Sequence, residues 1–168
     1  QTNPYPMGTR DVMLWQSSIS FDQLMVNVLW PSCNAASIAI VSDSDGFDPK
    51  TICRTVQRES VTVMLTVPSL ARLLNIQDGQ ISNLKLLWLG GERLSRVLTE
   101  WVSPYVVTWN SYGPTETTVG ILNFVLPQKG PRTADIPLGR PYWNCQIHFI
   151  PGCPSLMFLG GVNVGSGY

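Results

Sequence analysis

Histidine and charged residues are scarce in this chain. Its 168 residues include one histidine, His148, and only 13% of them are charged, with a formal net charge of zero. A neutral chain lacks the basic footprint of a nucleic-acid binder, so we expect no nucleic-acid partner. With a single histidine, His148 would have to be the base of any Ser-His or Cys-His nucleophile, which disfavours that class of catalysis.

Long apolar runs and paired cysteine motifs are also missing. No uninterrupted apolar run approaches the roughly 20 residues of a membrane span, so we expect no membrane partner. The four cysteines, Cys33, Cys53, Cys145 and Cys153, form no C-x-x-C pair, which disfavours a zinc site. We therefore expect reduced, mostly buried thiols in a cytoplasmic protein.

The beginning of the chain has neither a starting Met nor the basic start and apolar core of a signal peptide. We therefore expect the chain to begin inside a longer one. Hydrophobic residues make up 44% of it, which argues against disorder. Because so little charge is left for the surface, we also expect another part of the protein to cover some of it.

The first half alternates between helix-like and strand-like segments. Apolar spacing predicts helices over 21–31, 49–59, 69–75 and 94–102, and β-branched apolar runs predict strands over 36–42, 61–66, 84–89 and 105–109. Pro31 is expected to end the first helix, and Asp48-Pro49 to open the second. This alternation predicts an α/β fold, a flavodoxin-like parallel sheet with flanking helices, whose ligands bind beyond the carboxyl ends of the strands.

Prolines and glycines punctuate the chain beyond residue 119 and exclude a continuous helix there. Short strands are expected at 120–126, 145–150 and 156–160. The sequence thus predicts an α/β subdomain over 1–119 and the beginning of a small β-rich, barrel-like subdomain over 120–168.

The segment from Asn110 to Thr118 carries the strongest chemical signal. After a strand it offers the flat ring of Tyr112 for a base, the hydroxyl of Thr115, and the carboxylate of Glu116, a hard oxygen ligand suited to Mg²⁺. The alternative interpretation is a hairpin turn with a solvated Glu116 and a capping threonine.

Six segments in order resemble one family. Tyr112–Glu116 (YGPTE) resembles the signature of the AMP-forming adenylating superfamily. The other five resemble motifs of nonribosomal peptide synthetase adenylation domains: SSISFD at 17–22, VTVMLTVPSL at 61–70, LGGERL at 89–94, LGRP at 138–141 with Asn144, and LGG at 159–161 with Gly167-Tyr168.

The resemblance implies an enzyme that joins an amino acid to AMP from MgATP and passes it to the phosphopantetheine thiol of a carrier-protein domain. It implies that Asp22 pairs with the substrate's α-amino group, although Asp22 read by itself is a helix cap. Thr115 and Glu116 are then the catalytic residues, with Glu116 the Mg²⁺ ligand. The implied nucleotide contacts are Gly90, Gly91, Glu92, Asn110, Tyr112 and Thr115.

The family's side-chain pocket maps, by the same resemblance, onto Gln23, Val26, Leu65, Trp88, Gly90, Ser111, Val119 and Gly120, beside Asp22. Three of these residues are small and Trp88 can form a wall, so we expect a bulky or modified, uncharged substrate side chain.

Some family motifs are missing from the sequence. They are the Gly/Ser/Thr-rich phosphate loop, the Thr-Gly-Asp segment and the carboxy-terminal lid with its lysine, so we expect the chain to be inactive alone. The remaining subdomains of the adenylation domain are then its partners. Two alternatives remain: an excised specificity subdomain that only binds, and an acyl-CoA ligase-like enzyme acting on a carboxylic acid.

Overall fold

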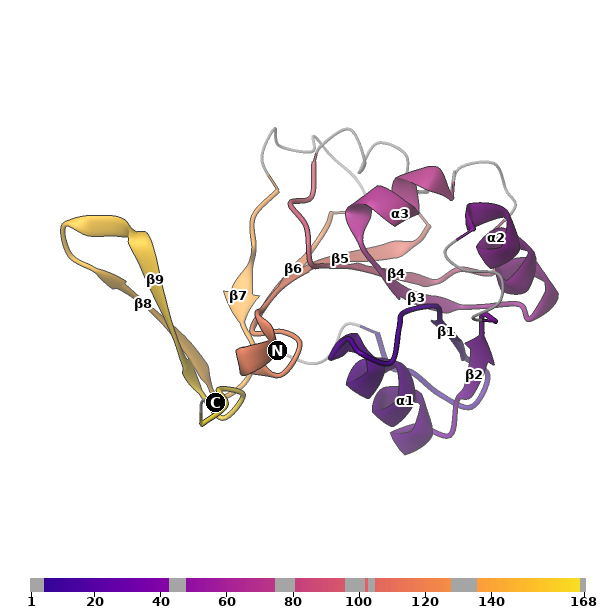
Figure 1. The fold of residues 1–168 in the computed structure, drawn as a ribbon, viewed down its shortest axis with the longest axis horizontal. Helices are drawn as coiled ribbons and strands as arrows, with labels where there is room; N and C mark the ends of the chain where they lie inside the picture. Colours follow the sequence, from indigo (N-terminus) through magenta and orange to yellow (C-terminus); the bar gives the residue numbers. More distant parts are fainter. Residues whose placement is uncertain are drawn as a thin grey trace.

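The computed structural model describes residues 5–42, 48–74, 81–95, 102, 105–127 and 136–166, without the side chains of residues 154 and 155 (Figure 1). The helix expected over 94–102 lies mostly outside the described residues. Within them, no helix is long and apolar enough to cross a membrane.

A seven-stranded sheet in the order β2-β1-β3-β4-β5-β6-β7 forms the body of the molecule. Its strands are β1 (Val12–Trp15), β2 (Ser37–Ile40), β3 (Val63–Thr66), β4 (Leu86–Leu89), β5 (Val107–Tyr112), β6 (Leu122–Val125) and β7 (Arg140–Pro141). The first five are parallel, and their order is that of flavodoxin-like folds, which confirms the predicted class.

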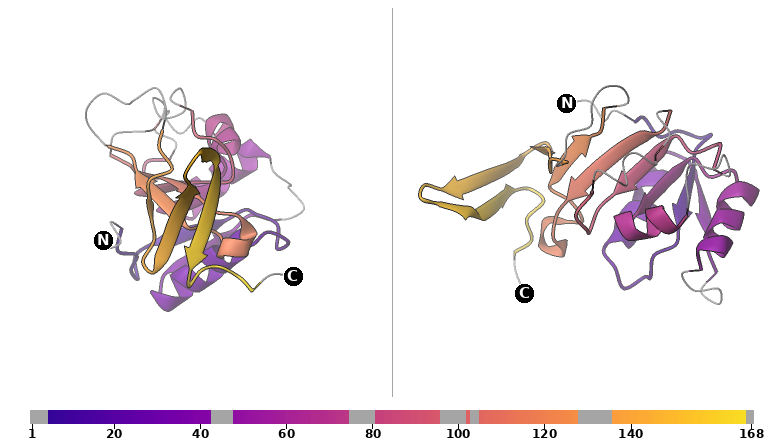
Figure 2. Two further views of the ribbon diagram at one scale, coloured as in Figure 1. Left: turned by 90° about the vertical axis from the view of Figure 1, so that its left-hand side faces the viewer. Right: turned by 90° about the horizontal axis from the view of Figure 1, so that it is seen from above.

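Helices cover both faces of this sheet (Figures 1 and 2). α1 (Gln23–Cys33) lies on one face, where Val26 and Trp30 pack on Leu65 and Trp109. α2 (Pro49–Arg58) and α3 (Pro68–Leu73) lie on the other, over a larger apolar core. The sheet therefore separates two layers, and each can carry its own site.

The helix ends agree with the sequence at α2 and disagree at α1. Asp48 caps α2, where its carboxylate accepts the backbone N–H groups of Lys50 and Thr51. Pro31, the predicted end of the first helix, lies inside α1, which runs on to Cys33. The proline removes a single helical hydrogen bond near the end of the helix, so its cost is small enough for the buried packing of Pro31 to outweigh it.

Two strands differ from the prediction in a way that affects the site. β1 was not predicted, because four apolar residues are too few to show a period, yet it lies inside the sheet beside β3. β5 was predicted to end at residue 109 and instead continues to Tyr112. Asn110, Ser111 and Tyr112 are consequently strand residues with alternating directions.

The second half of the chain begins in the same sheet. β6 pairs antiparallel with β5, and β7 with β6, so residue 119 marks a change from parallel to antiparallel pairing within one sheet. The separate two-stranded sheet starts later, with β8 (Cys145–Ile150) and β9 (Cys153–Gly161). This hairpin stands away from the main sheet (Figure 2).

A buried carboxylate ties the amino ends of the parallel strands together. Asp11 accepts hydrogen bonds from the Tyr5 hydroxyl (2.7 Å), the Gly8 backbone N–H (2.9 Å) and the Thr62 hydroxyl (2.9 Å). It also forms an ion pair of 3.0 Å with Lys85. The Asp11 carboxylate thus accepts hydrogen bonds from four different groups.

The four cysteines are free thiols. Cys145 is buried, Cys53 and Cys153 are half-buried, and Cys33 is exposed. The expectation of mostly buried thiols is therefore correct only for Cys145.

Candidate functional site

The polar residues singled out in the sequence gather at the carboxyl edge of the sheet. The loop after β1 leads to Asp22 and α1, the loop after β4 holds Gly90 to Glu92, and the loop after β5 begins at Gly113. The β1–β3 boundary is where the strand order reverses, which is the usual ligand position in such sheets.

Strand alternation sorts these residues onto two faces. Trp88 and Trp109 are cross-strand partners and pack with Leu65 on the α1 face. Leu89 pairs with Asn110 and packs on the opposite face, in the core shared with α2 and α3. The expected amino-acid pocket residues Leu65, Trp88 and Ser111 thus share the α1 face, while the expected nucleotide residues Asn110 and Tyr112 belong to the other.

Asp22 opens the α1 side of the site. It occupies the N-cap position of α1 with helical backbone angles, and its side chain makes no capping hydrogen bond. The interpretation of Asp22 as a side-chain cap is therefore wrong. Its half-buried carboxylate makes no hydrogen bond or ion pair to the described part of the chain.

Two glutamines fasten the segment around Asp22 to β3. The side-chain amides of Gln16 and Gln23 both donate to the carbonyl oxygen of Leu65, at 2.7 and 2.8 Å. These bonds connect the segment after β1 to β3, across the boundary where the strand order reverses. Gln23, expected to line the pocket, thus has its amide nitrogen engaged by the backbone of Leu65.

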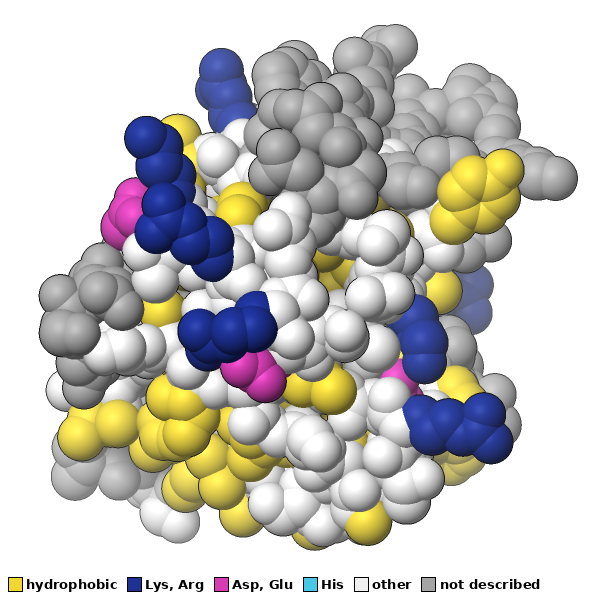
Figure 3. Space-filling view, turned by 90° about the vertical axis from the view of Figure 1, so that its right-hand side faces the viewer, with side chains coloured by type: hydrophobic (Ala, Val, Ile, Leu, Met, Phe, Trp, Pro, Cys, Tyr) yellow, Lys and Arg dark blue, Asp and Glu magenta, His cyan; other side chains and the backbone are white. Residues whose placement is uncertain are grey.

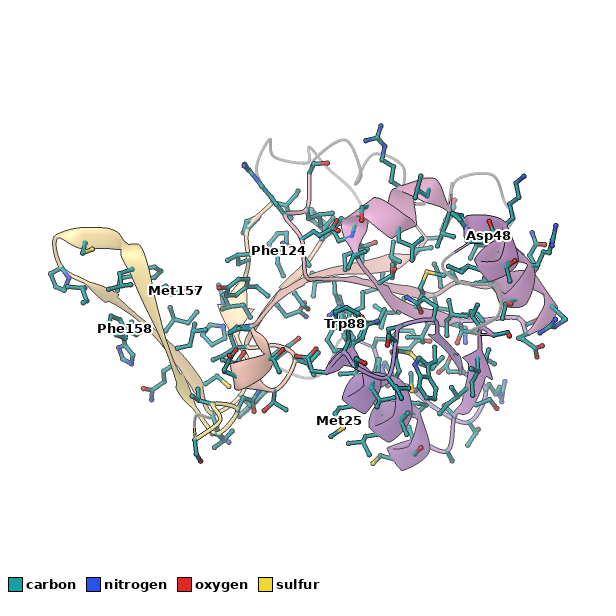
Figure 4. The ribbon with its side chains drawn as sticks, in the orientation of Figure 1. Met25, Asp48, Trp88, Phe124, Met157 and Phe158 are labelled. Carbon is teal, nitrogen blue, oxygen red and sulfur yellow. The ribbon has the colours of Figure 1, made fainter. Side chains whose placement is uncertain are left out.

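Aromatic rings fill the space beneath the expected pocket. Trp88 lies between the sheet and α1 (Figure 4), with its ring centroid 5.7 Å from that of Trp30 and 5.1 Å from that of Trp109. Val26 packs against the same group. The wall expected from Trp88 is thus supported by two further tryptophans that sequence reasoning did not assign.

Ser111 joins three polar side chains on the α1 face. Its hydroxyl accepts from Trp88 Nε1 at 2.6 Å and donates to Asn123 Oδ1 at 2.9 Å, and the Tyr142 hydroxyl lies 3.4 Å away. Asn123 and Tyr142 were not among the predicted site residues. The β5–β6 register places Asn123 opposite Ser111, and that register is not readable from the sequence.

The small residues of the expected pocket border backbone and ring atoms. A Cβ on Gly90 would lie 3.2 Å from the Ser111 carbonyl oxygen, and a Cβ on Gly120 would lie 3.3 Å from Tyr142 Cε2. Tyr142 therefore occupies space beside Gly120 that the sequence left open. Val119 is half-buried with a positive φ of 70°.

The other face carries the expected nucleotide contacts. Gly91 has a φ of +80°, a conformation that side chains disfavour. The Glu92 carboxylate accepts from the backbone N–H and hydroxyl of Ser69 at 2.9 and 2.8 Å, so it caps the first turn of α3. The Glu92 carboxylate is therefore engaged by Ser69, and only the backbone of Glu92 is left to contact an adenine base.

Asn110 and Tyr112 differ in accessibility. Asn110 is buried and its Nδ2 donates to the Pro137 carbonyl oxygen at 2.8 Å. The ring of Tyr112 is 37% exposed at the end of β5, where a planar base could stack on it. Of the two expected adenine contacts, only Tyr112 is exposed enough for a base to reach it directly.

Thr115 and Glu116 lie in a short 3₁₀ helix, η2 (Thr115–Thr117), inside the connection between β5 and β6. The connection closes tightly, because a Cβ on Gly113 would lie only 2.4 Å from the Gly120 Cα. The segment after β9 returns to it, and Gly165 N donates to the Glu116 carbonyl oxygen at 2.7 Å. Both functional side chains remain exposed. The segment thus connects two antiparallel strands, as the hairpin interpretation predicts. It also exposes Thr115 and Glu116, as a ligand-binding loop requires.

The donor set suits magnesium that arrives with phosphate. No group of three or more His, Cys, Asp or Glu side chains that could hold a metal ion occurs in the described part of the chain. Mg²⁺ commonly takes one or two carboxylates and completes its shell with water and phosphate oxygens. Glu116, with Thr115 beside it, fits that role better than an all-protein cage.

A separate groove of about 320 Å³ lies between α2 and the end of α3, lined among others by Lys50, Cys53, Arg54 and Leu74. Figure 3 shows this side of the molecule, where several lysine and arginine side chains are exposed. None of the expected site residues lines the groove.

Comparisons with known proteins identify the family and the fold of this chain. A family model described as AMP-binding enzyme matches residues 1–150. Surfactin synthase subunit 2 of Bacillus subtilis (strain 168) is 28% identical over 175 residues, which cover 97% of this chain and 5% of that protein. Delta-poly-L-ornithine synthetase of Acinetobacter baumannii (strain AB307-0294) is 33% identical over 122 residues, covering 72% and 9%.

A solved structure shares the fold. Holo-PA1221, described as a nonribosomal peptide synthetase protein containing adenylation and PCP domains, superposes with a TM-score of 0.83 at 20% identity, covering 96% of this chain and 30% of that chain. This chain thus spans a small part of its relatives. The family model, which matches most of the chain, shows that it belongs to the AMP-binding enzyme family, as the six motifs predicted.

Proposed function

We propose that this chain is the amino-acid-selecting part of an adenylation domain of a nonribosomal peptide synthetase. The domain joins an amino acid to AMP and releases pyrophosphate. One observation carries the proposal: on one face of the carboxyl edge the half-buried Asp22 carboxylate lies at the start of α1, which packs on the tryptophan cluster, and on the other face an exposed ring, hydroxyl and carboxylate lie in and beside η2. A reaction between two ligands needs two such sites at one edge.

The reaction needs positioning more than an enzyme nucleophile. A carboxylate oxygen of the amino acid attacks the α-phosphorus of ATP, a new C–O–P linkage forms, and the bond to pyrophosphate breaks. In this proposal Asp22 holds the α-ammonium group by a charge-assisted bond. Tyr112 stacks on the adenine, the backbone of Gly90 and Gly91 lies along it, and Thr115 donates to a phosphate oxygen. Mg²⁺, held by Glu116, would neutralise phosphate charge.

The partners follow from surfaces that the chain leaves uncovered. Phe21 lies just before α1, and Met25 and Leu29 lie on it; the three residues are spaced four apart and are 62%, 55% and 55% exposed. Met25 projects outward from the helix (Figure 4). A stripe of this kind suits packing by the remaining subdomains of an adenylation domain. A carrier domain, present beside the adenylation domain in holo-PA1221, would take the acyl group onto its phosphopantetheine thiol in the next step.

The test is amino-acid-dependent exchange of labelled pyrophosphate into ATP by the full-length chain that contains this segment. The proposal expects exchange that requires Mg²⁺ and one class of amino acid. Exchange supported equally by carboxylic acids without an amino group would instead favour the acyl-CoA ligase-like alternative, and amino-acid binding without any exchange would favour the module that only binds.

A further inference from the structure

The hydrogen-bond network around Ser111 leaves specific donors and acceptors unused. A serine hydroxyl has one hydrogen and two lone pairs. The hydrogen goes to Asn123 Oδ1 at 2.9 Å, and one lone pair accepts from Trp88 Nε1 at 2.6 Å. The Tyr142 hydroxyl, 3.4 Å away, can therefore only donate to the remaining lone pair.

Two groups of this network are then available to a ligand. The oxygen of Tyr142 keeps its lone pairs, because its hydrogen points to Ser111. The side-chain nitrogen of Asn123 keeps its two N–H groups, because only its oxygen has a partner in the part of the chain that the structure describes. The network offers one acceptor and one donor group, from two side chains that share the Ser111 hydroxyl, with no net charge.

The backbone holds both residues in place. Asn123 is fixed opposite Ser111 by the antiparallel register of β5 and β6. Gly139, with a φ of +92°, lets the segment that carries Tyr142 approach β6, since a Cβ there would lie only 1.9 Å from the Asn123 carbonyl oxygen. Tyr142 reaches from this segment to both Ser111 and Gly120. It therefore touches two of the expected pocket residues without belonging to the predicted set.

Both side chains are half-buried, which makes their polar groups selective. Burial raises the pKa of the Tyr142 hydroxyl, so the group is neutral and stays a hydrogen-bond partner at physiological pH. An apolar ligand in contact with these groups would leave them desolvated and unpaired, which is unfavourable.

We propose that Asn123 and Tyr142 are specificity-determining residues of the amino-acid pocket. They select an uncharged substrate side chain that ends in a hydrogen-bonding group such as a carboxamide or hydroxyl. The substrate oxygen accepts from the Asn123 amide, and its N–H or O–H donates to the Tyr142 oxygen. This inference rests on the proposed function and narrows the expected bulky, uncharged side chain to a polar one.

The experiment compares pairs of amino acids of similar shape in pyrophosphate exchange by the full-length chain: glutamine with methionine, threonine with valine, and tyrosine with phenylalanine. The wild-type chain should prefer the polar member of its best pair by roughly 10⁴-fold in kcat/KM, as sites built to pair a polar group do. Tyr142→Phe and Asn123→Leu should each narrow that ratio at least about tenfold, mainly by lowering activity on the polar member.

Tyr105→Phe is the matched control, since Tyr105 is 90% exposed and loses the same hydroxyl. It should leave the ratio unchanged. Should Asn123→Leu fail to fold, as seen by circular dichroism, Tyr142→Phe alone decides. A wild-type preference for the apolar member, or a ratio that Tyr142→Phe leaves intact, overturns this inference while the exchange itself upholds the proposed function. The absence of exchange with every amino acid contradicts the proposed function instead.

Discussion

The two ends of the parallel strands use their carboxylates in opposite ways. At the amino end, Asp11 is buried and accepts from a hydroxyl, a backbone amide, a second hydroxyl and a lysine. At the carboxyl end, Asp22 sits at the start of a helix without capping it and has no partner in the described part of the chain.

This difference separates a structural carboxylate from one suited to a ligand. A fully paired buried carboxylate stabilises the fold and has no capacity left for a substrate. A half-buried carboxylate beside a reversal point of the strand order contributes little to stability and is available for binding. Substituting the two carboxylates should therefore separate stability from activity.

The largest expected effect comes from Asp11→Ala at the amino end. The substitution leaves the hydroxyls of Tyr5 and Thr62 without their shared acceptor, at roughly 1–3 kcal/mol each, and we expect it to lower the free energy of unfolding by about 3–5 kcal/mol. The half-exposed Lys85 can turn to solvent. Urea denaturation followed by circular dichroism measures this. Asp48→Ala is the control, because it removes an exposed helix cap and should cost clearly less. Equal losses for the two variants would contradict a special role for Asp11.

Gly113→Ala should have the next largest effect, at the carboxyl end. Its Cβ would overlap the Gly120 backbone at 2.4 Å, so we expect a loss of about 1–3 kcal/mol together with loss of exchange activity. Gly8→Ala at the amino end is the matched variant, since nothing lies within 4 Å of its Cβ. Thermal unfolding of both variants tests this, and a Gly113→Ala protein as stable as Gly8→Ala would refute the close approach.

Acid should remove the stabilisation that Asp11 gives the amino end. Burial alone would raise the pKa of Asp11, but hydrogen bonds from Tyr5, Lys85, Gly8 and Thr62 outweigh it and lower the pKa from 3.8 to about 2. Because the folded pKa lies below the unfolded one, the stabilisation is present above about pH 4 and is lost as the pH falls toward 2. Unfolding titrations from pH 5 to 2 should show this loss in the wild-type chain and a weaker one in Asp11→Asn.

The smallest effect on stability is expected for Asp22→Asn. The side chain makes no capping bond, so we expect the free energy of unfolding to change by less than about 0.5 kcal/mol. The same denaturation experiment measures it. A loss comparable to that of Asp11→Ala would mean that Asp22 is also structural.

Local signals were sufficient to predict much of the fold. Asp48 and Pro49 mark the start of α2 because both act within one turn, and the β-branched run of β3 is recognisable by itself. β1 was missed because four residues carry no period, and β5 was predicted too short because Asn110 and Ser111 have low strand propensity but lie between two pairing strands.

Candidate residues were predictable where a motif is contiguous, as in Tyr112 to Glu116, and by resemblance at Asp22. Asn123 and Tyr142 were not, because their positions depend on the β5–β6 register and on the close approach at Gly139. Trp30 and Trp109 were missed for the same reason: only the packing of α1 on the sheet brings them under Trp88.

The central claim is that the carboxyl edge binds an amino acid through Asp22 on the α1 face. Its most direct test is pyrophosphate exchange by the wild-type chain and by Asp22→Asn, each with the preferred amino acid and with the analogue that lacks only the α-amino group. The account predicts that Asp22→Asn lowers kcat/KM for the amino acid about 100-fold and leaves activity on the analogue nearly unchanged. Equal losses on both substrates, or none on either, would contradict it.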